Sequence, residues 1–152
     1  MKEQFIGYWR LTNWEATLDG KFHSYPFGEK AEGELLYSET GRMFASLSYA
    51  ERPNFAAANL KKATPAERKS AVDSYVSYSG TFDIVDNTVQ HHVEYSLLPN
   101  WQGTDLVRIF EFSDDQETLT LSTAPETTSS GKIIINHLIW KRIKKSEVRP
   151  KI

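Results

Sequence analysis

Short extended stretches, several of which alternate apolar and polar residues, follow one another along most of this chain. They extend over residues 5–16, 34–38, 43–49, 81–85, 89–97, 105–112, 118–123 and 132–143. Turn residues separate them, among them Asp19-Gly20, Asp86-Asn87 and Asp114-Asp115. A period of two residues bounded by such turns predicts antiparallel strands joined by local connections. We therefore expect about eight strands.

A helix is predicted in the middle of the chain, where this alternation is lost. Thr64 and Glu67 form the two halves of a capping box, and Pro65 occupies the first turn, where its missing N–H costs nothing. We expect the helix to run to about Tyr78, just before Gly80. Its apolar positions fall at helical spacing and predict a face that packs across the barrel as a lid: Val72, Tyr75 and Val76.

Unpaired strand edges constrain how these elements assemble. A sheet of about eight strands must protect its edges, and closure into one barrel is the simplest solution for 152 residues. We therefore predict an all-β fold, a closed up-and-down antiparallel barrel with one helix across it. The domain covers residues 1–145, and a flexible tail follows at 146–152. An eight-stranded barrel has an interior wide enough for side chains or one small ligand.

The hairpin at residues 91–112 carries polar side chains where a core strand normally carries apolar ones. On its first strand His92, Glu94 and Ser96 share one face, and His91 begins the opposite face. On its second strand Arg108 shares a face with large apolar side chains. The alternation does not decide which face of the first strand points inward. Pairing of residues whose numbers sum to 200 or 202 places His92 or Glu94 opposite Arg108, whereas an odd sum separates them.

Two interpretations of this hairpin stay open. In the first, the polar cluster lies inside a cavity, where a buried charge must be paired or must contact a ligand. In the second, the cluster forms a polar outer face with an ordinary Glu94–Arg108 pair. Tyr25 and Phe27 also have an alternative role, which is to pin a loop to the core. For the cavity interpretation we expect these ligand-binding residues: Arg108, His92, Glu94, Ser96, Trp101, Tyr25, Phe27, Tyr78 and Phe110.

Composition narrows the classes of function. The net charge of −2, with acidic and basic residues interspersed, offers no track for nucleic acid and no membrane-seeking face. No window approaches the roughly 20 apolar residues of a membrane helix. Cysteine is absent, which excludes disulfides and thiolate chemistry. The first residues show no secretory signal pattern, so we expect a cytoplasmic protein.

A metal site is not expected. His91 and His92 could supply ligands together with His137 and Glu94. Neighbouring residues of one strand, however, point to opposite faces and cannot both enter the same site. We therefore predict no metal and no cofactor.

Several motifs taken together resemble a known family. Gly7-Tyr8-Trp9 near the start and Trp140-Lys141-Arg142 near the end resemble the lipocalin arrangement, in which a basic residue packs over the first-strand tryptophan. The resemblance covers nearly the whole chain. It implies a barrel with an internal cavity and does not identify the ligand. Further motifs are similar to those of the bacterial and fungal lipocalin-like domain proteins: Ser24-Tyr25-Pro26-Phe27-Gly28, Tyr37 with Gly41-Arg42-Met43, Tyr78-Ser79-Gly80-Thr81, and His91-His92-Val93-Glu94 running on to Pro99-Asn100-Trp101.

Three functions fit these expectations. The first is binding of a small, partly apolar organic molecule, whose polar or acidic end is held by Arg108 and His92. The second is a cofactor-free isomerase or cyclase acting on a small carbonyl-bearing metabolite, with His92 or Glu94 as the catalytic general base. The third is a structural or interaction barrel with a filled core. The sequence favours the first function, with a small molecule as the partner, and does not determine the oligomeric state.

Overall fold

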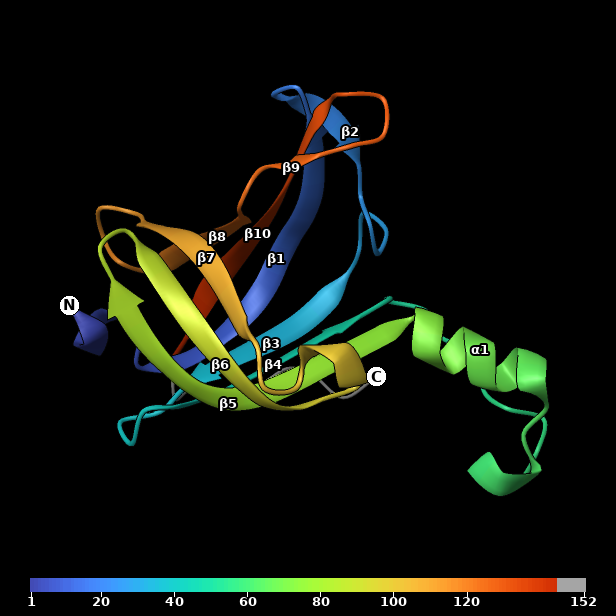
Figure 1. Ribbon diagram of the computed structural model, residues 1–152. Helices are drawn as coiled ribbons and strands as arrows, with labels where there is room; N and C mark the ends of the chain where they lie inside the picture. The colour runs from blue at the N-terminus through green and yellow to red at the C-terminus, as the bar shows by residue number, and fades with distance from the viewer. Residues whose placement is uncertain (145–152) are drawn as a thin grey trace.

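The computed structural model describes residues 1–144 of the 152 (Figure 1). Every predicted strand has a counterpart in it, and the tail predicted at residues 146–152 lies outside the described residues. The helical elements are α1 Pro65–Asp73 and the 3-10 turns η1 Lys2–Gln4, η2 Leu60–Lys62 and η3 Pro99–Trp101. The strands are β1 Gly7–Leu18, β2 Lys21–Ser24, β3 Glu32–Tyr37, β4 Arg42–Ser48, β5 Tyr75–Val85, β6 Thr88–Ser96, β7 Asp105–Phe112, β8 Thr118–Thr123, β9 Glu126–Thr127 and β10 Ile133–Ile143.

Eight of these strands close into an antiparallel barrel. Their order is β1-β3-β4-β5-β6-β7-β8-β10, and β10 pairs back with β1 to complete the ring. This closure extends along most of both strands, from Tyr8 opposite Ile143 to Leu18 opposite Ile134. The short strands β2 and β9 pair with the ends of β1 and β10 and extend one side of the barrel (Figure 1). The predicted closed up-and-down barrel of about eight strands is confirmed.

One end of the barrel is closed by aromatic packing. Trp9 is completely buried, and its indole N–H donates to the carbonyl of Phe5 at 2.9 Å. The guanidinium of Arg142 lies over the Trp9 ring, 4.2 Å from its centre, and donates to the carbonyls of Ile6 and Gln4. Phe5 is completely buried as well. The predicted stacking of Arg142 on Trp9 is confirmed, and it ties the first and last strands together at this end.

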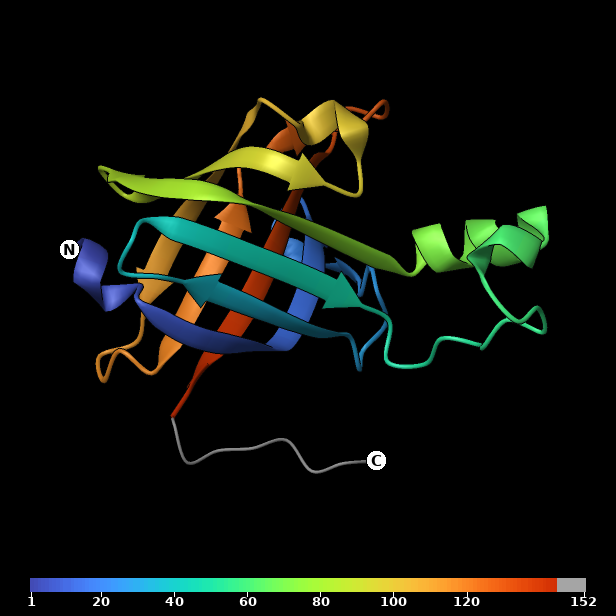
Figure 2. The ribbon, with the colours of Figure 1, turned by 90° about the horizontal axis from the view of Figure 1, so that it is seen from below.

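The helix is shorter than predicted and does not lie across the barrel. Its start is as predicted, because Thr64 and Glu67 cap each other through side chain and backbone. It ends at Asp73, since the residues from Tyr75 onward pair with β4 as part of β5. No residue of α1 is buried, and Figures 1 and 2 show α1 extending away from the barrel beyond the start of β5. The prediction of a lid is wrong, because Tyr75 and Val76 belong to a strand.

The hairpin of β6 and β7 has a register that separates its polar side chains. His92 lies opposite Asp105, so the numbers of paired residues sum to 197. The even sum that would place His92 or Glu94 opposite Arg108 does not occur. The connection sets this register, because the loop around η3 forms two backbone hydrogen bonds of 2.9 Å to the N–H and the carbonyl of Val93. A change of one residue in register turns every side chain to the other face. His91 and Arg108 therefore face inward, and His92 faces outward.

Candidate ligand-binding site

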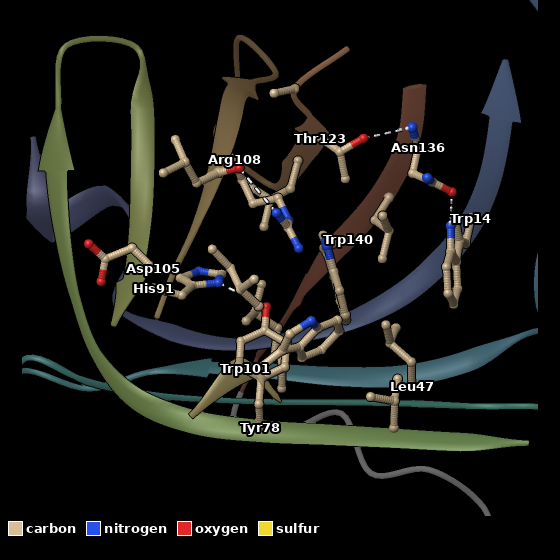
Figure 3. Close-up of a pocket in the computed structure, with 18 of the residues that line it drawn as sticks. Trp14, Leu47, Tyr78, His91, Trp101, Asp105, Arg108, Thr123, Asn136 and Trp140 are labelled. Carbon is tan, nitrogen blue, oxygen red and sulfur yellow. Dashed lines mark hydrogen bonds between the residues drawn. The ribbon is translucent and has the colours of Figure 1, made fainter. Parts of the chain in front are cut away.

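A cavity of about 450 Å³ lies inside the barrel (Figure 3). All eight barrel strands and η3 contribute residues to its walls. The alternation of side chains along each strand sends every second residue inward, so apolar residues such as Leu35, Leu47 and Leu121 form much of the lining. Pockets for small molecules in proteins have volumes of roughly 300–1,000 Å³. The cavity is therefore large enough for a molecule built on one aromatic ring.

Three of the four tryptophans of the chain line this cavity. Trp14, Trp101 and Trp140 come from β1, η3 and β10. Trp101 meets the ring of Tyr78 edge-on, with ring centroids 5.7 Å apart. The indole N–H of Trp14 donates to the side-chain oxygen of Asn136 at 3.0 Å. Flat aromatic walls of this kind suit a planar ligand, because aromatic rings gain from stacked and edge-on contacts.

His91 lies in the cavity wall between two tyrosines. Its Nε2 is 2.6 Å from the hydroxyl oxygen of Tyr37, and its Nδ1 is 2.9 Å from the hydroxyl oxygen of Tyr78. Burial, together with the charges of Arg108 and His92, lowers the pKa of His91 to about 3, so its ring is neutral at pH 7. Burial also raises the pKa of both tyrosine hydroxyls. The three side chains thus form a neutral hydrogen-bonded chain.

Arg108 brings a positive charge into the cavity wall. Its side chain is half-buried, and its one hydrogen bond within residues 1–144 runs from Nη1 to the carbonyl of Val107 at 3.1 Å. No carboxylate among these residues forms an ion pair with it, so the alternative of a Glu94–Arg108 pair is wrong. Its charge opposes the effect of burial, which raises the pKa of the Tyr78 hydroxyl in the same cavity wall. A cation in this position favours an anionic or strongly accepting ligand group.

His92 and Glu94 lie on the outside of the barrel. The His92 ring is held between two carboxylates, with Nδ1 2.6 Å from Asp105 and Nε2 3.1 Å from Asp83. Glu94 forms an ion pair with Arg42 on the neighbouring outer surface. Neither residue lines the cavity. The prediction that they face the interior is wrong, because the odd register of the hairpin turns this face of β6 to the outside.

Three of the other predicted site residues line the cavity, namely Tyr78, Trp101 and Arg108. Ser96 does not line the cavity. Its hydroxyl oxygen accepts a hydrogen bond from the backbone N–H of Leu98 at 3.0 Å, in the turn before η3. Phe110 packs into the closed end of the barrel, 4.9 Å from another phenylalanine ring. These two side chains support the walls without forming them.

The aromatic residues of the loop after β2 hold that loop in place. Phe27 packs between Trp14 and Tyr49, with both ring centroids 4.7 Å away. Tyr25 lies against Phe22 at 4.8 Å. Neither Tyr25 nor Phe27 lines the cavity, which agrees with the loop-pinning alternative. Phe27 still acts on the cavity indirectly, because it supports Trp14 from outside.

The cavity-lining residues that were not predicted from the sequence include three aromatic or hydrogen-bonding side chains besides His91: Trp14, Asn136 and Trp140. A regular two-residue alternation would put Trp14 on the face opposite Trp9, but a bulge between Leu11 and Asn13 shifts the alternation of β1 and turns Trp14 inward. The sequence carries no clear signal for this bulge. His91 shares its face of the strand with Val93. This apolar neighbour was the sign in the sequence that the His91 face points inward.

In residues 1–144, no three histidine, cysteine, aspartate or glutamate side chains are grouped so that they could hold a metal ion. In the same range, no helix is long and apolar enough to cross a membrane. The polar groups that line the cavity offer hydrogen bonds and charge, from residues such as Tyr78, Arg108 and Asn136.

Part of the sequence is similar to that of a fungal carrier protein. It is 33% identical over 88 residues to a "4'-hydroxy-3'-methoxypropiophenone carrier protein" of Aspergillus oryzae, a region that spans 53% of this chain and 78% of the relative. The sequence model of the lipocalin-like domain family matches residues 6–143, which include all eight barrel strands. The chain therefore belongs to the lipocalin-like domain family.

Proposed function

We propose that the protein binds and carries a small, partly apolar aromatic molecule in the cavity of its barrel. The observation that carries this proposal is the cavity of about 450 Å³, with three tryptophans in its wall and an inward-facing Arg108 that has no carboxylate partner in residues 1–144. The tryptophans bury the apolar body of the ligand, and Arg108 holds its polar or acidic end. The bound molecule completes contacts that the protein leaves open.

The comparisons support small-molecule binding in general terms. Proteins of the lipocalin-like domain family share this barrel, and the Aspergillus relative is named as a carrier of an aromatic ketone that also bears a phenolic hydroxyl. Such a molecule combines a planar ring with hydrogen-bond acceptors. These features complement aromatic walls and a guanidinium, so an aryl ketone or phenol is the first compound class to test.

The other two functions receive less support. The isomerase or cyclase hypothesis depended on His92 or Glu94 as a general base inside the cavity, and both side chains lie on the outer surface. No other observation favours catalysis. A barrel with a filled core is hard to reconcile with a cavity of this volume.

The test is a binding titration by isothermal calorimetry with 4'-hydroxy-3'-methoxypropiophenone and with 4-nitrophenol. We expect saturable binding of one molecule per chain, with a dissociation constant in the micromolar range, roughly −8 kcal/mol, for a ligand of this size.

Two neighbouring substitutions on β4 locate the bound molecule. Ala45 faces the cavity, whereas Ser46 lines a groove on the outer surface. Ala45→Phe fills the cavity and should abolish binding, while Ser46→Phe adds the same ring outside and should leave binding intact. Circular dichroism controls for folding of both variants. Absence of saturable binding by all aromatic probes, or equal binding by the two variants, would overturn the proposal.

A further inference from the structure

The chain of hydrogen bonds through His91 has a direction that the protein itself determines. A neutral imidazole has one N–H donor and one nitrogen acceptor, so one tyrosine must donate to His91 and the other must accept from it. Tyr37 is 1% exposed, does not line the cavity, and has His91 as its one hydrogen-bond partner in residues 1–144. Its hydroxyl hydrogen is satisfied only if it donates to Nε2 of His91, because a buried donor without an acceptor is costly.

The direction of this chain leaves a donor free in the cavity. Since Nε2 of His91 accepts from Tyr37, the ring hydrogen lies on Nδ1 and is donated to the hydroxyl oxygen of Tyr78. The hydroxyl hydrogen of Tyr78 then has no acceptor among residues 1–144, and Tyr78 lines the cavity. The opposite tautomer would leave the hydrogen of Tyr37 unsatisfied in the core. The buried chain thus makes Tyr78 a donor toward the ligand.

A second unsatisfied donor lies in the same wall. Trp140 is 2% exposed, and its Nε1 is buried without a hydrogen-bond partner in the described part of the chain. It is the one buried side-chain nitrogen or oxygen of residues 1–144 in this state. Trp140 lines the cavity, and Figure 3 shows the nitrogen edge of its indole and the guanidinium of Arg108 turned toward each other. Both donors belong to the lining of the same cavity, so an acceptor group of a bound ligand can satisfy them.

We propose that Arg108, Trp140 and Tyr78 form a subsite for a negatively charged oxygen, so that the protein selects aromatic ligands in their ionised form, as phenolate or carboxylate. This inference rests on the proposed function and deepens it, because it names the charge state of the ligand. Three donors, one of them cationic, stabilise an anion more than its neutral acid or ether. The subsite therefore lowers the pKa of a bound phenol.

The other ionisable groups of the cavity do not cancel this preference. The lining contains Tyr78, His91, Asp105, Arg108 and Glu126. His91 is neutral, and the carboxylate of Asp105 already binds His92 on the outer side, at 2.6 Å. Glu126 belongs to the short strand β9, which pairs with the beginning of β10, Ile133 and Ile134. Trp140 lies near the other end of β10, so this donor is at a distance from the Glu126 carboxylate. Arg108 pairs opposite Thr123, closer to Glu126 along the chain, but no ion pair joins Glu126 and Arg108 within residues 1–144.

The test compares 4-nitrophenol with 4-nitroanisole, its methyl ether, which has the same ring and cannot ionise. Dissociation constants are measured by equilibrium dialysis at pH values on both sides of the ionisation of 4-nitrophenol. The phenolate should bind about tenfold or more tightly than the ether, and its absorbance should appear in the complex at a pH where the free probe is still neutral. Ether binding reports any pH effect of the cavity's own groups.

Matched variants separate the effect of losing a hydrogen-bond donor from the effect of changing the aromatic ring that carries it. Trp140→Phe and Tyr78→Phe each remove one donor and should reduce the preference for phenolate over ether by about three- to tenfold. Trp14→Phe is the control, because the N–H of Trp14 is already bonded to Asn136. That variant should weaken phenolate and ether equally. Nitrogen-15 chemical shifts of the imidazole should identify the Nδ1–H tautomer of His91.

The outcomes distinguish this inference from the function on which it rests. Saturable ether binding together with equal or weaker phenolate binding would overturn the anion subsite and leave the carrier function standing. The Nε2–H tautomer, or an unchanged phenolate preference in both donor variants, would also overturn it. Absence of binding by every aromatic probe would instead contradict the carrier function itself.

Discussion

Replacement of Arg108 by leucine should separate ligand binding from stability. Arg108 is half-buried, with a single hydrogen bond to a backbone carbonyl and no ion pair within residues 1–144. Truncating a buried charge that contacts a charged partner costs about 2–5 kcal/mol of affinity. Because solvent still reaches this side chain, we expect the lower part of that range, about 2–3 kcal/mol, or roughly 30- to 150-fold in the dissociation constant.

The same substitution should have little effect on folding. The lost hydrogen bond to Val107 is worth about 1 kcal/mol, and the leucine side chain gains contacts with the apolar cavity wall. We therefore expect the free energy of unfolding to change by less than about 1 kcal/mol. Isothermal calorimetry with 4-nitrophenol at alkaline pH measures the first effect, and urea denaturation followed by circular dichroism measures the second.

A matched control is the arginine on the outer surface. Arg42 pairs with Glu94 and does not line the cavity, so Arg42→Leu should leave the affinity for the probe unchanged. Equal affinities of wild type and Arg108→Leu would refute the assignment of Arg108 to the ligand. A loss of more than about 3 kcal/mol in unfolding free energy would show that Arg108 is mainly structural.

Three further predictions concern the barrel itself. Trp9→Ala should lower the unfolding free energy by about 3–5 kcal/mol, because it deletes a completely buried ring, and a near-neutral value in urea denaturation would contradict the aromatic closure. Gly80→Ala should cost about 3 kcal/mol, since its new Cβ would lie 1.8 Å from the carbonyl oxygen of His92, whereas Ser79→Ala should be mild. Hydrogen bonds that the His92 ring donates to the carboxylates of Asp105 and Asp83 raise the pKa of His92. Its stabilising contribution is therefore complete below the unfolded-state pKa of about 6.5 and is lost as pH rises through the folded-state value. The difference in unfolding free energy between wild type and His92→Gln should therefore be larger at about pH 5.5 than at about pH 8.5, and a constant difference would rule this out.

The sequence by itself determined the elements that local chemistry specifies. Alternation of apolar and polar residues located the strands, and the Thr64 and Glu67 capping box located the start of the helix. The pair of Trp9 and Arg142 was predictable because closing a barrel brings the first and last strands together, whatever the details of the loops. Each of these features depends on a few neighbouring residues or on closure alone.

The end of the helix was decided by tertiary pairing. Tyr75, Val76 and Tyr78 fit a helical stripe, but Val76 and Tyr78 also alternate with Ser77 and Ser79 as residues of a strand do. β-branched and aromatic residues gain more from cross-strand packing than from an exposed helix, and β4 supplies the partner strand. The sequence of this segment fits both the helical period and the strand period. Only the presence of β4 as a partner strand decides between them.

The composition of the site was also decided by the tertiary structure. The loop around η3 sets the odd register of β6 and β7, and a bulge in β1 reverses the alternation before Trp14. Either change moves a side chain from one face of the sheet to the other without altering the sequence pattern. The sequence therefore identified Arg108 as the unusual inward charge but named His92 instead of His91 beside it. Register is a property of two strands and their connection, and a single strand's pattern cannot specify it.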